Sequence, residues 1–234
     1  MTWIQRLPGT SAPVAAVAVI PDNRGHTGIV YSDEAEESWL LHLAFHHQLQ
    51  RDLLDGTCGW ILSGASIPKE RLEHVAAMCA RVWQRYEVGG LPYGFRYVAS
   101  RFNEEGVFVL GADERGLTCA TFVLAVYRAV GLELLKLDEW PQREEDQERF
   151  EALMRLLARR CSDVLHVEAV RKQTRAIRYR PLEVAGGSGC ALPATFSDAV
   201  SVATAIEEEL VELDHEASIM DSVPPAGSGQ REEP

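Results

Sequence analysis

Residues 25–31 read GHTGIVY and residues 39–46 read WLLHLAFH, and these two stretches decide the fold. The first follows the turn-forming segment 22–25 and predicts a strand over 26–31. The second is an apolar run of strand length, although length and periodicity also allow a helix to begin there. If the two stretches form an antiparallel pair, the sixteen-residue separation lets His26 and His42 lie side by side.

A third stretch, GLTCATFV at residues 116–123, places Cys119 where a charged, irregular segment gives way to an apolar helix. The first turn of a helix carries the positive end of the macrodipole and unpaired N–H groups, and both favour the thiolate. Cys119 precedes Phe122 and Val123 by three and four residues, so it belongs to the core-facing stripe of this helix.

The remaining pattern is mixed. Strands are predicted at 13–20, 58–63 and 107–110, with one or two more within 166–179. Helices are predicted at 68–86, 119–130, 141–160 and 197–213.

The composition is that of a globular protein that is not embedded in a membrane: of 234 residues, 46% are hydrophobic and 25% are charged. No apolar stretch approaches the roughly 20 residues of a transmembrane helix. The N-terminal residues lack the features of a secretory signal. We therefore expect the protein in the cytoplasm, or exported without a classical signal peptide.

The five cysteines are odd in number and widely spaced, so neither a disulfide framework nor a structural zinc site is expected. The pair His46-His47 has no carboxylate or cysteine at a matching spacing, so no metal site is expected.

The net charge of −12 is concentrated in one part of the chain. Residues 183–234 contain eleven acidic residues and one basic residue, which leaves −2 on residues 1–182. We predict a catalytic domain over 1–182 and an acidic extension over 183–234, with a linker at 186–189, a helix, and disorder from 222. The acidic tail could serve a protein partner or pair with the basic segment 171–180. The negative charge argues against nucleic acid as a partner.

These residues supply the parts of a cysteine nucleophile site. Cys119 is the candidate nucleophile, and His26 is the candidate base. His42 is the candidate for orienting His26 and fixing its tautomer, with His46 and His47 as alternatives.

Three stretches, Gly25–Tyr31, Leu40–Ala44 and Leu117–Val123, resemble the permuted NlpC/papain-like superfamily. This group includes lecithin retinol acyltransferase-like and YiiX-like cysteine hydrolases. The resemblance covers roughly residues 14–135. It implies an α+β fold with a permuted papain-like core, in which a small antiparallel sheet packs on the cysteine helix, with helical additions.

The resemblance also assigns the roles of nucleophile, base and orienting residue to Cys119, His26 and His42. The segment Gly90–Tyr93 looks like the Pro-Tyr segment that precedes the cysteine in this group, which implies that Tyr93 lines the substrate pocket or stabilises an oxyanion.

The function that follows is a cysteine-dependent hydrolase or acyltransferase that acts on an amide, ester or thioester of a peptide, protein or lipid. This chemistry requires no cofactor. The alternative is a non-catalytic interaction protein that keeps the papain-like scaffold.

Overall fold

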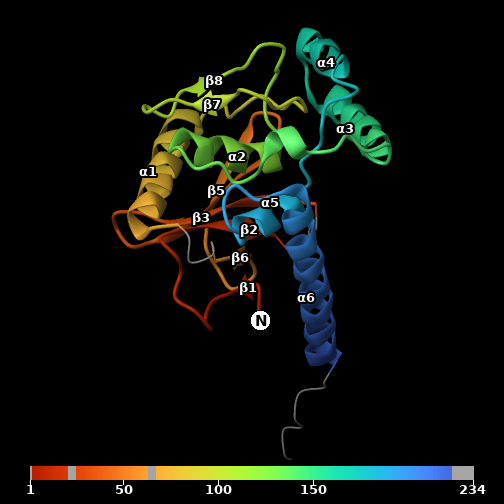
Figure 1. Cartoon of the computed structure of the whole chain (residues 1–234). Helices are drawn as coiled ribbons and strands as arrows, with labels where there is room; N and C mark the ends of the chain where they lie inside the picture. Colours follow the sequence, from red (N-terminus) through yellow and green to blue (C-terminus); the bar gives the residue numbers. More distant parts are fainter. Residues whose placement is uncertain (1, 21–24, 63–66, 223–234) are drawn as a thin grey trace, which may run out of the picture.

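The computed structural model describes residues 2–20, 25–62 and 67–222, which form an α+β fold (Figure 1). Its main sheet has six antiparallel strands in the order β1-β6-β2-β3-β4-β5. A separate two-stranded sheet pairs β7 with β8.

The strands are short, and most are buried. They are β1 Ile4–Gln5, β2 Ala15–Val19, β3 Thr27–Ser32, β4 Ser38–Phe45, β5 Gln48–Leu53, β6 Gly59–Ile61, β7 Arg101–Phe102 and β8 Phe108–Val109. The helices are α1 Lys69–Tyr86, α2 Cys119–Ala129, α3 Asp146–Arg160, α4 Val164–Arg171, α5 Pro181–Ser188 and α6 Phe196–Ser222, with the short 3₁₀ helix η2 at Leu137–Glu139. None of these helices is long and apolar enough to cross a membrane.

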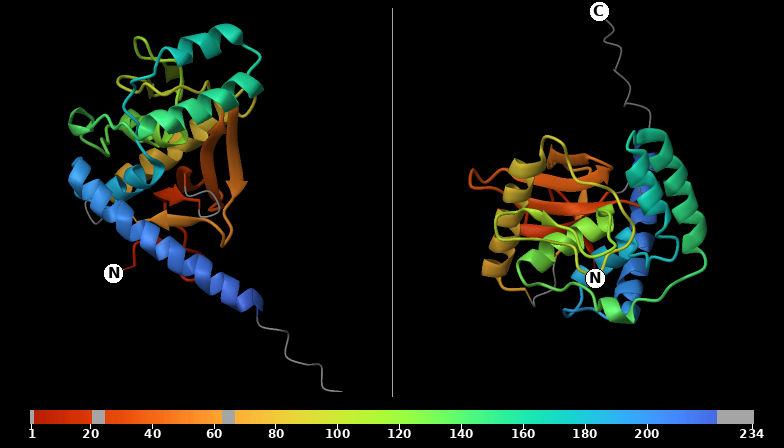
Figure 2. Two further views of the ribbon diagram at one scale, coloured as in Figure 1. Left: turned by 90° about the vertical axis from the view of Figure 1, so that its right-hand side faces the viewer. Right: turned by 90° about the horizontal axis from the view of Figure 1, so that it is seen from above.

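One face of the sheet carries the main hydrophobic core. Helices α1, α2 and α5 contact the sheet on this face, which presents Val17, Ile29 and Leu41 (Figures 1 and 2). Alternate residues of the same strands, such as Val30 and Leu40, face a smaller cluster on the other side. This alternation follows from the two-residue period of a strand.

Most of the predicted elements are confirmed. The stretch with two readings, 39–46, is strand β4, and it pairs with β3 as the hairpin argument requires. The predicted helices at 68–86, 119–130 and 197–213 correspond to α1, α2 and α6. The helix predicted from 141 begins at Asp146. The disorder predicted for the last residues falls, from 223 onward, outside the described ranges.

The prediction of strands within 166–179 is wrong. Residues 164–171 form helix α4, and 172–180 continue without regular structure. Asp163 caps this helix, because its carboxylate accepts a hydrogen bond from His166 N at 3.0 Å. Val167 and Val170 are buried three residues apart, which is helical rather than strand spacing.

The flexible linker predicted at 186–189 is also wrong, because residues 186–188 end helix α5. A Cβ on Gly186 would lie 2.4 Å from Ala199 O in α6, so glycine is needed for the two helices to approach closely. Val184 and Ile206 belong to the same core as the sheet. The boundary expected at 182/183 therefore falls within α5, in a segment packed against the body.

The first residue of the acidic extension, Glu183, contacts the basic segment 171–180 through Arg180. Glu183 forms ion pairs with Arg143 and Arg180. Figure 1 shows α6 leading away from α3 and α4.

Substituting Gly186→Ala should lower the free energy of unfolding by about 1–3 kcal/mol, because the added methyl group forces α5 and α6 apart. Gly9→Ala is the control, since its Cβ would be 3.5 Å from its nearest neighbour. Urea unfolding of both variants checks this. Equal midpoints for the two variants would contradict the packing argument.

Candidate active site

His26 and His42 come together because β3 and β4 form an antiparallel pair. Ile29 pairs with Leu41, so Gly28 lies opposite His42. A Cβ on Gly28 would lie 2.8 Å from His42 Cβ, and its absence leaves room for the imidazole. Nε2 of His26 lies 2.7 Å from Nδ1 of His42, and the rings meet edge to face with centroids 4.8 Å apart. The predicted juxtaposition of the two histidines is thus confirmed.

Asp52, on strand β5, extends this pair to a chain of three side chains. Its Oδ2 lies 3.0 Å from Nε2 of His42. His42 is buried, whereas the Asp52 side chain is 61% exposed. Sequence reasoning missed Asp52 because it predicted no strand over 48–53. The spacing of Gln48, Gln50 and Asp52 at every second position of QLQRDL was the available signal.

The carboxylate of Asp52 determines where the protons lie on both rings. A carboxylate only accepts hydrogen bonds, so Nε2 of His42 carries its proton and donates to Asp52. A His42 ring that carries only this proton accepts at Nδ1 from Nε2–H of His26. Neutral His26 is left with an unprotonated Nδ1, the nitrogen able to act as a base.

His26 is held in its neutral form. Burial, and next the neighbouring His42, lower the pKa of His26 from 6.5 to about 4. At neutral pH its Nδ1 lone pair is therefore available to accept a proton.

Cys119 is the first residue of α2, and the hydrogen bonds that cap this helix do not use its N–H. Thr118 and Thr121 form a reciprocal capping box, with the Thr118 side chain accepting from Thr121 N and the Thr121 side chain accepting from Thr118 N. This box satisfies the third N–H of the helix and leaves the first two, of Cys119 and Ala120, beside the sulfur atom.

The thiolate expected from the helix position alone is not the resting form. Burial raises the pKa of the Cys119 thiol, and hydrogen bonding from the N–H groups of Thr27 and Ala120 only partly offsets this. The side chain is 8% exposed, so the cost of desolvating a thiolate exceeds the effect of the helix end. Cys119 and His26 therefore rest as a neutral thiol and a neutral imidazole.

The sulfur atom of Cys119 lies against the backbone on both sides of His26. Sγ is 3.9 Å from Gly25 O, and the N–H of Thr27 also interacts with it. Within the described ranges no hydrogen bond joins Sγ to the His26 ring. The structure thus places the Cys119 thiol against the backbone that flanks His26, while the His26 ring contacts His42.

Tyr93 lines the same cavity as Cys119. The segment around it is fixed to the start of α2, because Leu117 N donates to Pro92 O at 3.0 Å. Burial raises the pKa of Tyr93, and the Cys119 thiol adds to this effect, so the phenol keeps its proton. The prediction that Tyr93 lines a pocket with the nucleophile agrees with this geometry, and its contact with substrate stays a prediction.

His46 and His47, the alternatives for orienting the base, lie at the β4–β5 turn with other partners. His46 Nδ1 accepts from Tyr93 N at 3.1 Å, and its Nε2 lies 3.2 Å from Cys161 Sγ. His47 Nδ1 donates to Gly89 O. Across the described residues, no group of three His, Cys, Asp or Glu side chains could hold a metal ion.

Comparison with known proteins gives no match: no family model, no curated protein and no solved structure matches this chain.

The neutral, half-buried His26 should make the protein less stable in acid. Because its pKa is depressed in the folded state, the unfolded chain binds a proton first as the pH falls from 6.5 toward 4. Through this group, the free energy of unfolding should be about 2 kcal/mol lower at pH 4.5 than at pH 7. His26→Gln should remove that part of the loss, whereas His74→Gln, an exposed position on α1, should not. Urea unfolding at both pH values measures the difference, and identical losses in wild type and His26→Gln would refute it.

Proposed function

We propose that this protein is a cysteine-dependent hydrolase or acyltransferase with a permuted papain-like core. The observations that carry the proposal are the chain from Asp52 through His42 to His26, and the contact of Cys119 Sγ with the backbone on either side of His26. The order of the elements agrees with it, since the histidine strands β3 and β4 precede the cysteine helix α2 and contact it.

The reaction begins with a proton transfer coupled to attack. Sγ of Cys119 attacks the carbonyl carbon of an amide, ester or thioester while its proton passes to Nδ1 of His26. The N–H groups of Cys119 and Ala120 stabilise the oxyanion, since neither has a helical partner. The histidine that gains the proton is stabilised through His42 by Asp52.

Collapse of the tetrahedral intermediate expels the amine, alcohol or thiol, which takes the proton from His26 Nδ1. A thioester on Cys119 remains. Water then attacks this thioester while giving a proton to Nδ1, and the acid is released with the thiol regenerated. A second nucleophile in place of water would make the same site an acyltransferase.

Acylation of Cys119 can be tested with 4-nitrophenyl butyrate and mass spectrometry of the protein. We expect one butyryl adduct, on the Cys119 peptide, that is absent from Cys119→Ala and forms about 100-fold more slowly in His26→Ala. Cys161→Ala and Cys190→Ala are matched controls, because these are the two less buried thiols. No adduct, or equal modification of all five thiols, would favour the non-catalytic interaction protein.

Asp52 should contribute by orienting the two histidines. Asp52→Ala removes the acceptor that places the proton on His42 Nε2, so acylation should slow about tenfold or more, while Asp52→Asn, which keeps an acceptor oxygen, should lose less. Gln50→Ala is the control on the same strand. Rates of nitrophenol release measure the effect. Equal rates in Asp52→Ala and Gln50→Ala would exclude this role.

A further inference from the structure

The cavity beside Cys119 combines an apolar wall with a basic one. It encloses about 630 Å³ and is bounded near the thiol by Gly25 and Thr118. Phe95, Phe150 and Leu153 supply apolar surface, as in pockets that bind small molecules.

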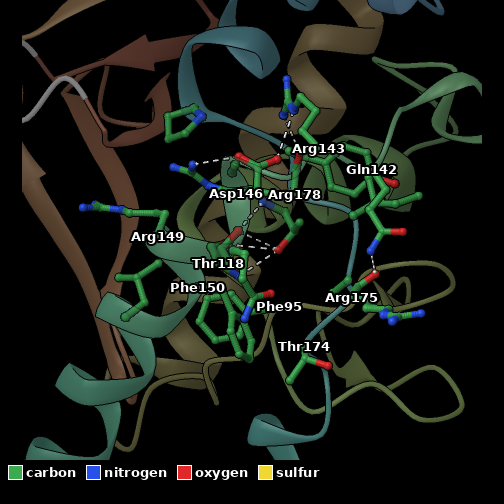
Figure 3. Close-up of a pocket in the computed structure, with 18 of the residues that line it drawn as sticks. Phe95, Thr118, Gln142, Arg143, Asp146, Arg149, Phe150, Thr174, Arg175 and Arg178 are labelled. Atoms are coloured by element: carbon green, nitrogen blue, oxygen red, sulfur yellow. Dashed lines mark hydrogen bonds and ion pairs between the residues drawn. The ribbon is translucent and has the colours of Figure 1, made fainter.

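Part of the positive charge around this cavity is already neutralised. Asp146 accepts hydrogen bonds from Arg143, Arg178 and Arg180 at 2.9–3.2 Å. Arg143 also pairs with Glu183. Figure 3 shows Arg143, Asp146 and Arg178 of this cluster close together beside Thr118. These side chains are mostly buried, and their charges and hydrogen bonds are satisfied by one another. They therefore form a wall of the cavity.

The same cluster fixes the segment 174–180 along the cavity. Arg143 Nη2 donates to Arg178 O at 3.0 Å, and Gln142 Nε2 donates to Arg175 O at 3.2 Å. This segment has no regular structure of its own, so these bonds to backbone carbonyls set its position.

Two arginines at the cavity have no ion pair within the part of the chain that the structure describes. Arg149 comes from α3 and Arg175 from the segment 174–180, and both are exposed. Figure 3 shows them on opposite sides of Thr118 and Phe150. Beyond the paired Asp146, the carboxylate lining the cavity is that of Glu144, so positive charge is in excess.

This charge acts on the groups at the reaction centre. Arg178 opposes the rise in the pKa of Cys119. Arg149 and Arg178 oppose the rise in the pKa of Tyr93. The cavity is therefore electrostatically suited to negative charge close to the thiol.

We propose that this cavity takes an acyl substrate that carries an anionic group, a carboxylate or a phosphate, next to an apolar portion. Arg149, on one side of Thr118 and Phe150, or Arg175, on the other, binds the anionic group, and Phe95 and Phe150 contact the apolar portion. Guanidinium groups suit both anions, because they donate paired hydrogen bonds in a planar fork. The inference rests on the proposed function, since it assigns the substrate class of the Cys119 site.

Binding can be tested separately from catalysis with the full-length Cys119→Ala variant. Phenyl phosphate and benzoate are the anionic probes, and benzyl alcohol is the neutral probe of similar size. By calorimetry, we expect both anions, or the one that matches the natural group, to bind more tightly than the alcohol. The affinity for these anions should fall as salt is added. Adding Arg149→Gln and Arg175→Gln should weaken anion binding about 10- to 100-fold.

Arg96→Gln is the matched control, because Arg96 is an exposed arginine that lines a neighbouring cavity, which Arg175 also borders, and does not line the cavity beside Cys119. It should leave anion binding unchanged. Loss of anion binding in Arg96→Gln to the same extent, or equal binding of anions and alcohol, would overturn the proposal.

Catalysis supplies the second test. With Cys119 intact, Arg149→Gln/Arg175→Gln should lower kcat/KM for mono-4-nitrophenyl adipate about 10- to 100-fold and leave that for 4-nitrophenyl butyrate unchanged. If both esters are cleaved through Cys119 with no dependence on the two arginines, the anion site is wrong and the proposed function stands. If the arginines bind anions but neither ester is cleaved, the anion-binding cavity stands and the proposed function fails.

Discussion

The register between β3 and β4 is the constraint on which the candidate site depends. It sets Gly28 opposite His42 and so gives the His42 imidazole the space to reach His26. A shift by one residue would turn His42 to the other face of the sheet and break both of its hydrogen bonds. The register is protected because Ile29 and Leu41 are fully buried in the main core. Apolar burial on one face thereby holds polar groups in position on the other.

The protonation states of the Cys119 thiol and the His26 imidazole depend on the balance between burial and hydrogen bonding. The start of α2 offers N–H groups to the sulfur, but the side chain is too buried for these to make the thiolate the resting form. Burial also keeps His26 neutral. In the proposed reaction, a neutral thiol and a neutral base differ from a preformed ion pair, because charge would appear only as the thiol attacks. The N–H groups of Cys119 and Ala120 are then available to the oxyanion.

The C-terminal part of the body builds the wall of the cavity rather than a separate unit. Helix α5 packs beneath α2 and against α6, with Gly186 at the closest approach. Glu183, at the start of α5, binds Arg143, which in turn holds the segment 174–180 by its backbone. Residues that the charge pattern assigned to an acidic extension therefore support the substrate side of the candidate active site. The charge pattern could not reveal this, because an ion-paired Glu183 and an exposed acidic residue look alike in sequence.

The sequence by itself determined the α+β class and most of the elements, because apolar periodicity and helix-start signals act over short distances. The adjacency of His26 and His42 also followed, since it needs only a hairpin. Tertiary structure alone decided that Asp52 hydrogen-bonds His42, which partners His46 and His47 have, and that burial keeps the Cys119 thiol protonated. It also made residues 186–188 a packing surface for α6. Each of these depends on groups distant in the chain, and local pattern carries no information about which distant group removes a side chain from water or accepts its hydrogen bond.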